Sequence, residues 1–208
     1  FLRNIRYVKR VDFIKYWSYA LKISIPMIPH SLAMIVLTQI DRLMIVKFSG
    51  NASAGLFSFG FNYAVLMLII SNALFQAYNP WLYASYEKND FRSIKKTNEI
   101  ITFSLCVITI ILIAIGPEVL FVLGTSEFMD AKWVIPPIAL AALFQFVYSN
   151  YSSLELYHKR TRIIAAGTIL ISIVNVILNY SFIPIYGFYA AGYTTFVCYF
   201  LLAMFHLY

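Results

Sequence analysis

Six long windows of this sequence are almost free of charged residues, and each is long enough to form a membrane-spanning helix. A helix rises about 1.5 Å per residue, so about 20 residues cross a hydrocarbon core of about 30 Å. A soluble fold would need six core helices without a polar face, and the pattern argues against it. We therefore expect an all-α integral membrane protein whose spans cover approximately residues 23–48, 54–78, 100–123, 133–156, 163–183 and 189–207.

The composition agrees, because 61% of the residues are hydrophobic and only 12% are charged, against about a quarter in soluble domains. The net charge of +7 comes from basic residues that lie on alternate sides of the windows. Such an asymmetry places the basic side in the cytoplasm and indicates contacts with anionic lipid rather than nucleic acid. Both ends of the chain are then expected to be cytoplasmic. The basic side holds Arg3, Arg6, Lys9, Arg10, Lys15, Lys22, Lys88, Arg92, Lys95, Lys96, Lys159, Arg160 and Arg162, and the other side holds Lys47 and Lys132.

Residues 1–22 alternate basic and aromatic side chains, which is typical of an amphipathic segment in the cytoplasmic interface or of an ordinary basic linker. The chain begins with Phe1 and shows no signal peptide, so we expect it to be part of a longer protein. Cys106 and Cys198 both fall within windows, where we expect them to act as small apolar fillers.

The first window carries its polar residues on one face of a helix. At 100° per residue, four of them fall within about 40° of one another, with Gln39 and Asp41 on the flanks of that arc. The opposite side is apolar and is expected to face lipid. The four polar residues are Ser24, Ser31, Thr38 and Arg42, and the apolar ones are Leu32, Val36, Ile40 and Leu43.

Two other windows have polar stripes at helical spacing. In the second window these are Ser58 and Asn62 near one end and Asn72, Gln76 and Asn79 near the other. In the fifth window they are Thr161, Thr168, Ser172, Asn175 and Asn179. Such stripes serve either helix packing or the lining of a polar cavity. We favour a cavity for the second window and leave both interpretations open for the fifth. The third window is nearly uniform and is expected to face lipid on most sides.

Asp41 and Arg42 lie next to each other inside the first window, where a charge costs about 2.5–3.5 kcal/mol. Successive residues point about 100° apart on a helix, so the two do not pair well with each other. Each needs another partner, and the pair is either an interhelical salt bridge or part of a hydrophilic transport pathway. We expect the partner of Asp41 to lie outside these 208 residues.

Enzyme signatures are weak, and we do not expect an enzyme. The histidines His30, His158 and His206 are scattered, without metal-ligand spacing. We interpret His158 as a solvated residue of a basic turn and Glu155 as a carboxylate that reaches the membrane interface. No phosphate-binding glycine loop or nucleophile elbow is present.

Two stretches resemble a known family of membrane transporters. "SIPMIPHSLAMIVLTQIDRLMIV" resembles the first helix of the C-terminal lobe of Wzx-type bacterial polysaccharide flippases, with its Pro-x-x-Pro start and its intramembrane Asp-Arg. "NVILNYSFIPIYGFYAAGYTT" resembles a later segment of the same lobe, although Ala190 stands where the family more often has glycine. The resemblance covers essentially the whole chain after residue 20.

The resemblance implies a MATE-like fold of the multidrug, oligosaccharidyl-lipid and polysaccharide exporter superfamily, with two six-helix lobes around a cavity that opens alternately to either side. Residues 23–208 would form the C-terminal lobe, and its partners would be the missing N-terminal lobe, membrane lipid and a polyprenyl-diphosphate-linked oligosaccharide. The location would be the bacterial inner membrane, where the substrate crosses for synthesis of O-antigen lipopolysaccharide or capsule.

The same resemblance implies roles for single residues. Arg42 matches the motif arginine and would contact the diphosphate or an acidic sugar. Asp41 matches the motif aspartate and would either pair with a charge across the lobes or bind a coupling cation, Na⁺ or H⁺. Asn175 and Asn179 match the asparagines of the second motif. No other cofactor, and no structural metal, is expected. The transport pathway would include Thr38, Gln39, Asp41, Arg42, Asn62, Asn72, Gln76, Asn175 and Asn179.

Three other functions stay open from the sequence: a related exporter, an integral membrane enzyme and a purely structural membrane subunit. A related exporter could extrude drugs or flip a peptidoglycan precursor. A membrane glycan polymerase or acyltransferase would need large outer loops with Arg or His, and the outer loops here are short. A lone lobe would expose its polar stripes to lipid, so we do not expect this chain to transport by itself.

Overall fold

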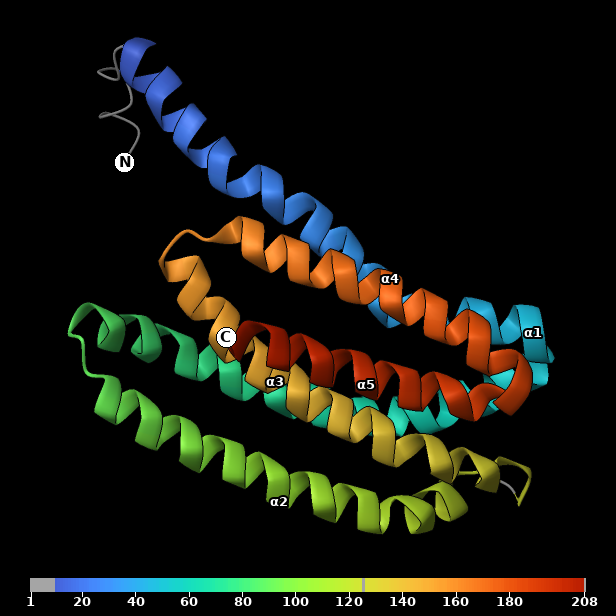
Figure 1. The fold of residues 1–208 in the computed structure, drawn as a ribbon. Helices are drawn as coiled ribbons and strands as arrows, with labels where there is room; N and C mark the ends of the chain where they lie inside the picture. The colour runs from blue at the N-terminus through green and yellow to red at the C-terminus, as the bar shows by residue number, and fades with distance from the viewer. Residues whose placement is uncertain (1–9, 125, 208) are drawn as a thin grey trace.

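The computed structural model of the protein describes residues 10–124 and 126–207, with side chains from residue 13 onward. These residues form an elongated bundle of long helices (Figure 1). Five of the helical stretches are long and apolar enough to span a membrane, so the expected all-α membrane fold is confirmed at this level. The elements are α1 (Arg10–Glu87), α2 (Phe91–Leu123), the 3₁₀ helix η2 (Ser126–Val134), α3 (Ile135–Tyr157), α4 (Thr161–Tyr186) and α5 (Phe188–Leu207).

Helix α1 consists of two arms that meet at Gly50. The backbone there leaves the helical region, with φ 84° and ψ 173°, a conformation that glycine adopts far more readily than other residues. The arms then run back alongside each other (Figure 1), and Arg42 on the first arm contacts Asn62 on the second. In a straight helix these residues would be about 30 Å apart. The first two expected spans therefore occupy the two arms of α1.

The connection between these arms differs from the expected loop. The expected spans 23–48 and 54–78 leave residues 49–53 as a loop, but the chain is helical on both sides of Gly50. Nothing lies within 4 Å of where a side chain on Gly50 or Gly55 would begin, so glycine there does not serve close packing. The change of direction is confined to one residue, so the two arms count together as α1 among the five α-helices of the described residues.

The helices pack through apolar layers along the length of the bundle. At the Gly50 end, Ile45, Phe57 and Val134 are fully buried together. Farther along, Met67 and Phe146 join the second arm of α1 to α3 and α2. Helix α2 lies at the edge of the bundle (Figure 1) and buries only Leu105, Thr109, Gly116 and Leu120. Its other faces are apolar and exposed, as expected for a helix that meets lipid on most sides.

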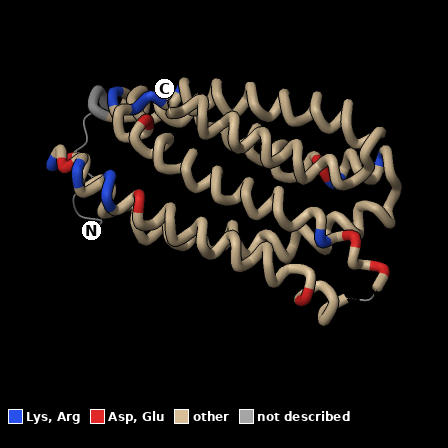
Figure 2. Tube along the Cα trace, turned by 60° about the horizontal axis from the view of Figure 1, so that its bottom comes forward, with Lys and Arg blue, Asp and Glu red and all other residues tan. Residues whose placement is uncertain are grey.

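The described basic residues gather mainly at one end of the bundle, with the loops before α2 and before α4 (Figure 2). The prediction that this end of the bundle faces the cytoplasm depends on this clustering. The orientation in a membrane stays a prediction. Residues 10–22 continue directly into α1 as helix. Residues 1–9 of the predicted interfacial segment lie outside the described part of the chain.

Candidate functional site

A buried carboxylate, Asp41, is the centre of the strongest polar cluster. Its side chain lies inside the bundle, with 1% of its surface exposed. The amide nitrogen of Asn179 donates to Oδ1 at 2.6 Å, and the hydroxyl of Thr195 donates to Oδ2 at 2.6 Å. These donors come from α4 and α5, so one carboxylate joins three helices. Both oxygens are hydrogen-bonded, which is the condition for burying such a group at tolerable cost.

The donors are themselves held by neighbouring side chains. Asn179 Nδ2 also donates to Asn175 Oδ1 at 3.2 Å, one helical turn earlier on α4. The hydroxyl of Thr194 donates to the side-chain amide oxygen of Asn179, Oδ1. Asn175 and Asn179 have no exposed surface. The cluster of Asp41, Asn175, Asn179, Thr194 and Thr195 is therefore preorganised, and we call it the Asp41 cluster.

The expectation that the partner of Asp41 lies outside the chain is wrong. Asn179 and Thr195 are 138 and 154 residues away in the sequence, and the folding of α4 and α5 onto the first arm of α1 brings them together. The expectation assumed a partner of opposite charge, whereas two neutral donors, Asn179 of the α4 stripe and Thr195 of α5, are sufficient. The whole α4 stripe of Thr161, Thr168, Ser172, Asn175 and Asn179 is buried inside the bundle.

A small cavity of about 30 Å³ borders Asp41, a volume that suits a single water molecule or a small ion. Thr38, Thr195 and two residues that we had not singled out, Gln145 and Tyr199, lie around it, although the surface that lines it is almost entirely apolar. Gln145 Oε1 and the Tyr199 hydroxyl are buried and have no hydrogen-bond partner among the described residues. Tyr199 follows Thr195 by one helical turn, and this spacing was the one signal in the sequence that could have indicated it.

Arg42 has a different environment from Asp41, as the 100° step between successive residues requires. Its guanidinium donates to Asn62 Oδ1 at 3.3 Å and lies 4.9 Å from the centre of the Phe61 ring. Its Nε has no partner among the described residues. Arg42 is half-buried and Asn62 is exposed, so the cation sits at the edge of the bundle with unused hydrogen-bonding capacity.

The structure does not bring all the predicted pathway residues together. Gln39 and Gln76 are exposed, and Asn72 is half-buried, and no hydrogen bond joins any of them to the Asp41 cluster in the described part of the chain. Thr38 borders the cavity, but its hydroxyl donates to the carbonyls of its own helix. Asn79 accepts a hydrogen bond from Ser153 of α3. The three amides of the second arm of α1 therefore do not form one continuous lining.

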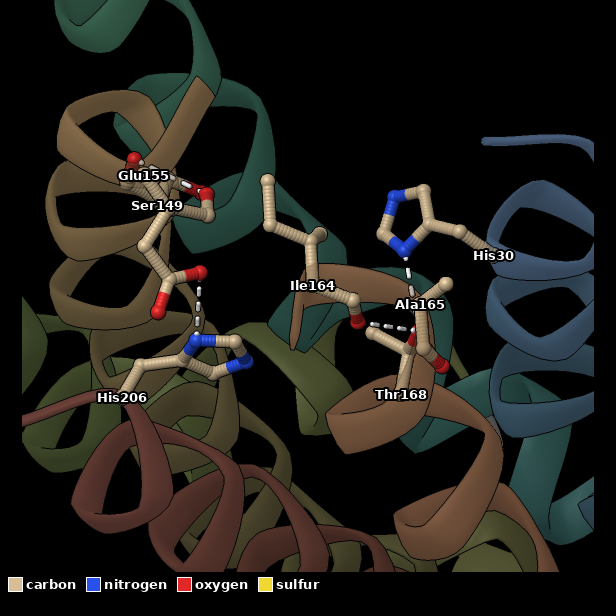
Figure 3. A network of polar contacts seen from close by, with 8 residues as sticks. His30, Ser149, Glu155, Ile164, Ala165, Thr168 and His206 are labelled. Atoms are coloured by element: carbon tan, nitrogen blue, oxygen red, sulfur yellow. Dashed lines mark hydrogen bonds and ion pairs between the residues drawn. The ribbon is translucent and has the colours of Figure 1, made fainter. Parts of the chain in front are cut away.

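A second buried pair lies near the other end of the bundle (Figure 3). Glu155 Oε2 of α3 is 2.8 Å from His206 Nδ1 of α5, and the His206 side chain has no exposed surface. Glu155 was expected to be a solvent-directed interfacial carboxylate, and this interpretation is wrong. No pattern in the sequence indicates the pair directly, because the two residues are 51 positions apart and periodicity does not determine which sides of their helices face each other.

The histidines are less scattered in space than in sequence. His30 Nδ1 of α1 lies 3.0 Å from the Thr168 hydroxyl of α4 (Figure 3). On its other side, α4 meets His206, whose Nε2 would be 2.7 Å from a Cβ placed on Gly167. His30 and His206 thus pack against successive residues of α4. His158 is exposed, as expected for a solvated residue.

Comparison of the chain with protein-family models, curated proteins and solved structures finds no match. The helical fold and the apolar helices identify a multi-pass membrane protein. A more specific function has to be argued from the residues around Asp41 and Arg42.

Proposed function

We propose that this chain is the C-terminal lobe of a flippase that moves a polyprenyl-diphosphate-linked oligosaccharide across the cytoplasmic membrane by alternating access. Each arm of α1 would cross the membrane, which gives the lobe six crossings. An N-terminal lobe in the same protein would cover the exposed polar residues Gln39, Asn62 and Gln76. The product would serve synthesis of a surface polysaccharide such as O-antigen or capsule.

The observation that carries this proposal is the separation of the two adjacent charges. Asp41 is fully enclosed by donors from α4 and α5, whereas Arg42 reaches the edge of the bundle beside Asn62 and Phe61. An interhelical salt bridge would use both charges on each other or on one opposite charge, and neither has such a partner among the described residues. A structural role alone does not explain why Arg42 has hydrogen-bond donors without a partner.

Arg42 suits the diphosphate and the first sugars of the substrate. A guanidinium can form two parallel hydrogen bonds to phosphate oxygens, and the amide of Asn62 and the ring of Phe61 suit sugar hydroxyls and sugar faces. Arg42 lies eight residues from Gly50, or about 12 Å along the helix. In the proposed orientation this depth lies in the outer half of the membrane, where the head group must pass.

Asp41 suits a coupling ion, H⁺ or Na⁺. The carboxylate of Asp41 and the hydroxyl of Thr195 are oxygen ligands of the kind that hard cations prefer, and both residues border the cavity of about 30 Å³. Asp41 and Thr195 would contact the ion, and Asn175 and Asn179 would hold the carboxylate in position through their hydrogen bonds. Since the cluster joins α1, α4 and α5, uptake of the ion would change how these helices hold one another.

A related exporter is the second candidate, because the same lobe could extrude an amphiphilic drug or flip a peptidoglycan precursor. The apolar groove of about 530 Å³ beside Phe182, Tyr186 and Tyr193 favours an amphiphile of some kind. A drug would not need the cation at Arg42, whereas a diphosphate would. Genes for glycosyltransferases and sugar-nucleotide synthesis beside this one would favour the surface glycan.

The test is complementation of a strain that lacks the full-length protein. Arg42→Ala is expected to abolish surface glycan while the protein still inserts into the membrane at normal abundance. Lys47→Ala is the matched control, because Lys47 is also basic, is exposed and lies on the same arm of α1. Normal export by the Arg42→Ala variant would contradict the assigned role.

A further inference from the structure

A basic hollow lies between the start of α1 and the turn that joins α3 to α4. Its volume is about 490 Å³, and its lining includes Lys22 of α1 together with Lys159, Arg160 and Arg162 of the turn. Tyr19 completes one wall, and the Lys159 ammonium lies 4.9 Å from the centre of its ring. Segments about 137 positions apart in the sequence thus place four cations around one space.

No carboxylate neutralises these cations in the described part of the chain. The ion pairs found there are Lys95 with Glu99 and His206 with Glu155. Glu155, four residues before Lys159, does not line the hollow, and its carboxylate contacts His206. Four like charges around one space repel each other, most strongly at a membrane interface where water screens them less. An anion in the hollow would remove this cost.

The first turn of α4 adds neutral donors to the same place. Thr161 and Arg162, the first two residues of α4, line the hollow, and no side-chain hydrogen bond caps the N-terminus of this helix. Ile163 also lines the hollow, but its N–H donates to the Arg160 carbonyl. The first backbone N–H groups of a helix lack partners within it and carry partial positive charge. The helix start alone would not define a site, but here it opens into the hollow that the four cations surround.

The backbone of the turn is shaped to hold Lys159 in position. Lys159 has a φ of 60°, which side-chain-bearing residues seldom adopt. Its N–H and that of Arg160 are used in the turn, by the carbonyls of Leu156 and Glu155. The N–H groups of the turn itself are thus occupied, and the lysine side chain is directed to Tyr19.

From this arrangement we infer that the hollow binds the phosphate of an anionic lipid head group. The apolar residues Ile23 and Ile163 also line it, and exposed apolar side chains of α1 and α4 continue from there toward the membrane core, Ile25 and Leu170 among them. A lipid can fill both regions, because its phosphate meets the cations while its acyl chains follow the apolar helix faces. A free phosphate would contact only the cations. The inference does not depend on the proposed transport activity.

The test is native mass spectrometry of the full-length protein in detergent with added phosphatidylglycerol, phosphatidylcholine or inorganic phosphate. We expect retention of phosphatidylglycerol over phosphatidylcholine, and no displacement by millimolar phosphate. Lys22→Gln with Lys159→Gln should weaken phosphatidylglycerol binding about tenfold or more, since each cation near an anionic surface contributes about 1 kcal/mol. Lys88→Gln with Lys96→Gln removes the same charge from another loop and should leave binding unchanged.

Thermal unfolding of each variant without lipid shows whether the fold is intact, and Lys22→Arg with Lys159→Arg should retain binding if the first pair of variants unfolds. Equal loss in both glutamine pairs would overturn the inference, because binding would then reflect overall charge. Equal retention of the two lipids would overturn it as well. Full displacement by inorganic phosphate would assign the hollow to a soluble anion instead of a lipid.

Discussion

The amide of Asn179 donates a hydrogen bond of 2.6 Å to Asp41, and this contact joins α4 to the first arm of α1. Thr195 makes the matching contact from α5. A buried carboxylate with donors from two other helices fixes how the three helices meet. The ion proposed to bind Asp41 would compete with these donors. Its binding would therefore change the contacts of α1 with α4 and α5.

Removing the amide of Asn179 should destabilise the bundle. Asn179→Leu keeps the approximate size but leaves Asp41 with one donor, and a hydrogen bond to a charged group contributes about 1.5–3 kcal/mol. We expect a lower midpoint of thermal unfolding in detergent. Ser181→Ala on the same helix is the control, because its exposed hydroxyl bonds only to its own helix. If Asp41→Asn abolishes the effect of Asn179→Leu, the contact itself is the cause, and additive losses would contradict it.

Gly60 marks the closest approach between α1 and η2. A Cβ at this position would overlap the Ala131 carbonyl oxygen and lie 3.1 Å from the Cβ of Val134. Gly60→Ala should therefore destabilise the protein by about 1–3 kcal/mol, measured by thermal unfolding. Gly55→Ala should be neutral or stabilising, because nothing lies within 4 Å of its Cβ position and alanine favours helix. Equal stability of the two variants would show that the two segments do not meet at Gly60.

The Glu155 and His206 pair should stabilise the end of the bundle more than an exposed pair does. His206 has no exposed surface, so Glu155→Ala leaves its buried ring without a polar partner, at a cost of about 1–3 kcal/mol. Glu99→Ala breaks the exposed contact with Lys95, whose charged atoms are 3.9 Å apart, and should cost about 0–1 kcal/mol. Thermal unfolding of both variants measures the difference. Equal losses would mean that His206 finds another partner when Glu155 is removed.

The start of α2 should become less protected at low pH. The side chain and the backbone N–H of Ser93 both hydrogen-bond Asp90, which lowers the pKa of that carboxyl, and Asp90 caps the helix. A lowered pKa in the folded state means that the cap is fully formed above the unfolded pKa and is lost as pH falls through the folded value. Hydrogen exchange of the Ser93 amide, corrected for intrinsic rates, should rise in that range.

Asp90→Asn provides the comparison for this effect. Asparagine also caps helices but does not titrate, so protection of the Ser93 amide should then be independent of pH across the same range. A pH dependence that persists in the Asp90→Asn variant would assign the change to another group.

The helices and their apolar faces could be predicted because each window is long and free of charge. Leu32, Val36 and Leu43 of α1 are exposed as the helical wheel predicted, but Ile40, expected on the same side, packs against the core at the Gly50 end. The reversal at Gly50 was not predicted in this form, since a loop several residues long was expected between the first two spans. A single glycine with positive φ turns the chain, and neither its isolation nor the helical state of its neighbours can be derived from local propensity.

The contacts between helices could be predicted only in part. Periodicity placed Asn175 and Asn179 on one face of α4, but it does not say which helix that face meets. Gln145 and Tyr199 each lie one helical turn from another polar residue, Ser149 and Thr195, but this spacing does not say which helix or cavity they meet. Glu155 was expected at the membrane interface because it is near the end of its helix. Its contact with His206 depends on the packing of α5 against α3, which the sequence pattern does not predict.

The most direct test of the proposed function is transport by the purified full-length protein in liposomes. A fluorescent polyprenyl-diphosphate-linked oligosaccharide in the outer leaflet should become inaccessible to added enzyme or quencher as it moves inward through the wild-type protein. Asp41→Asn and Arg42→Ala should each reduce this rate at least about tenfold, and Lys47→Ala should not. Movement at the wild-type rate in both the Asp41→Asn and the Arg42→Ala variants would contradict the proposal that these two charges form the transport pathway.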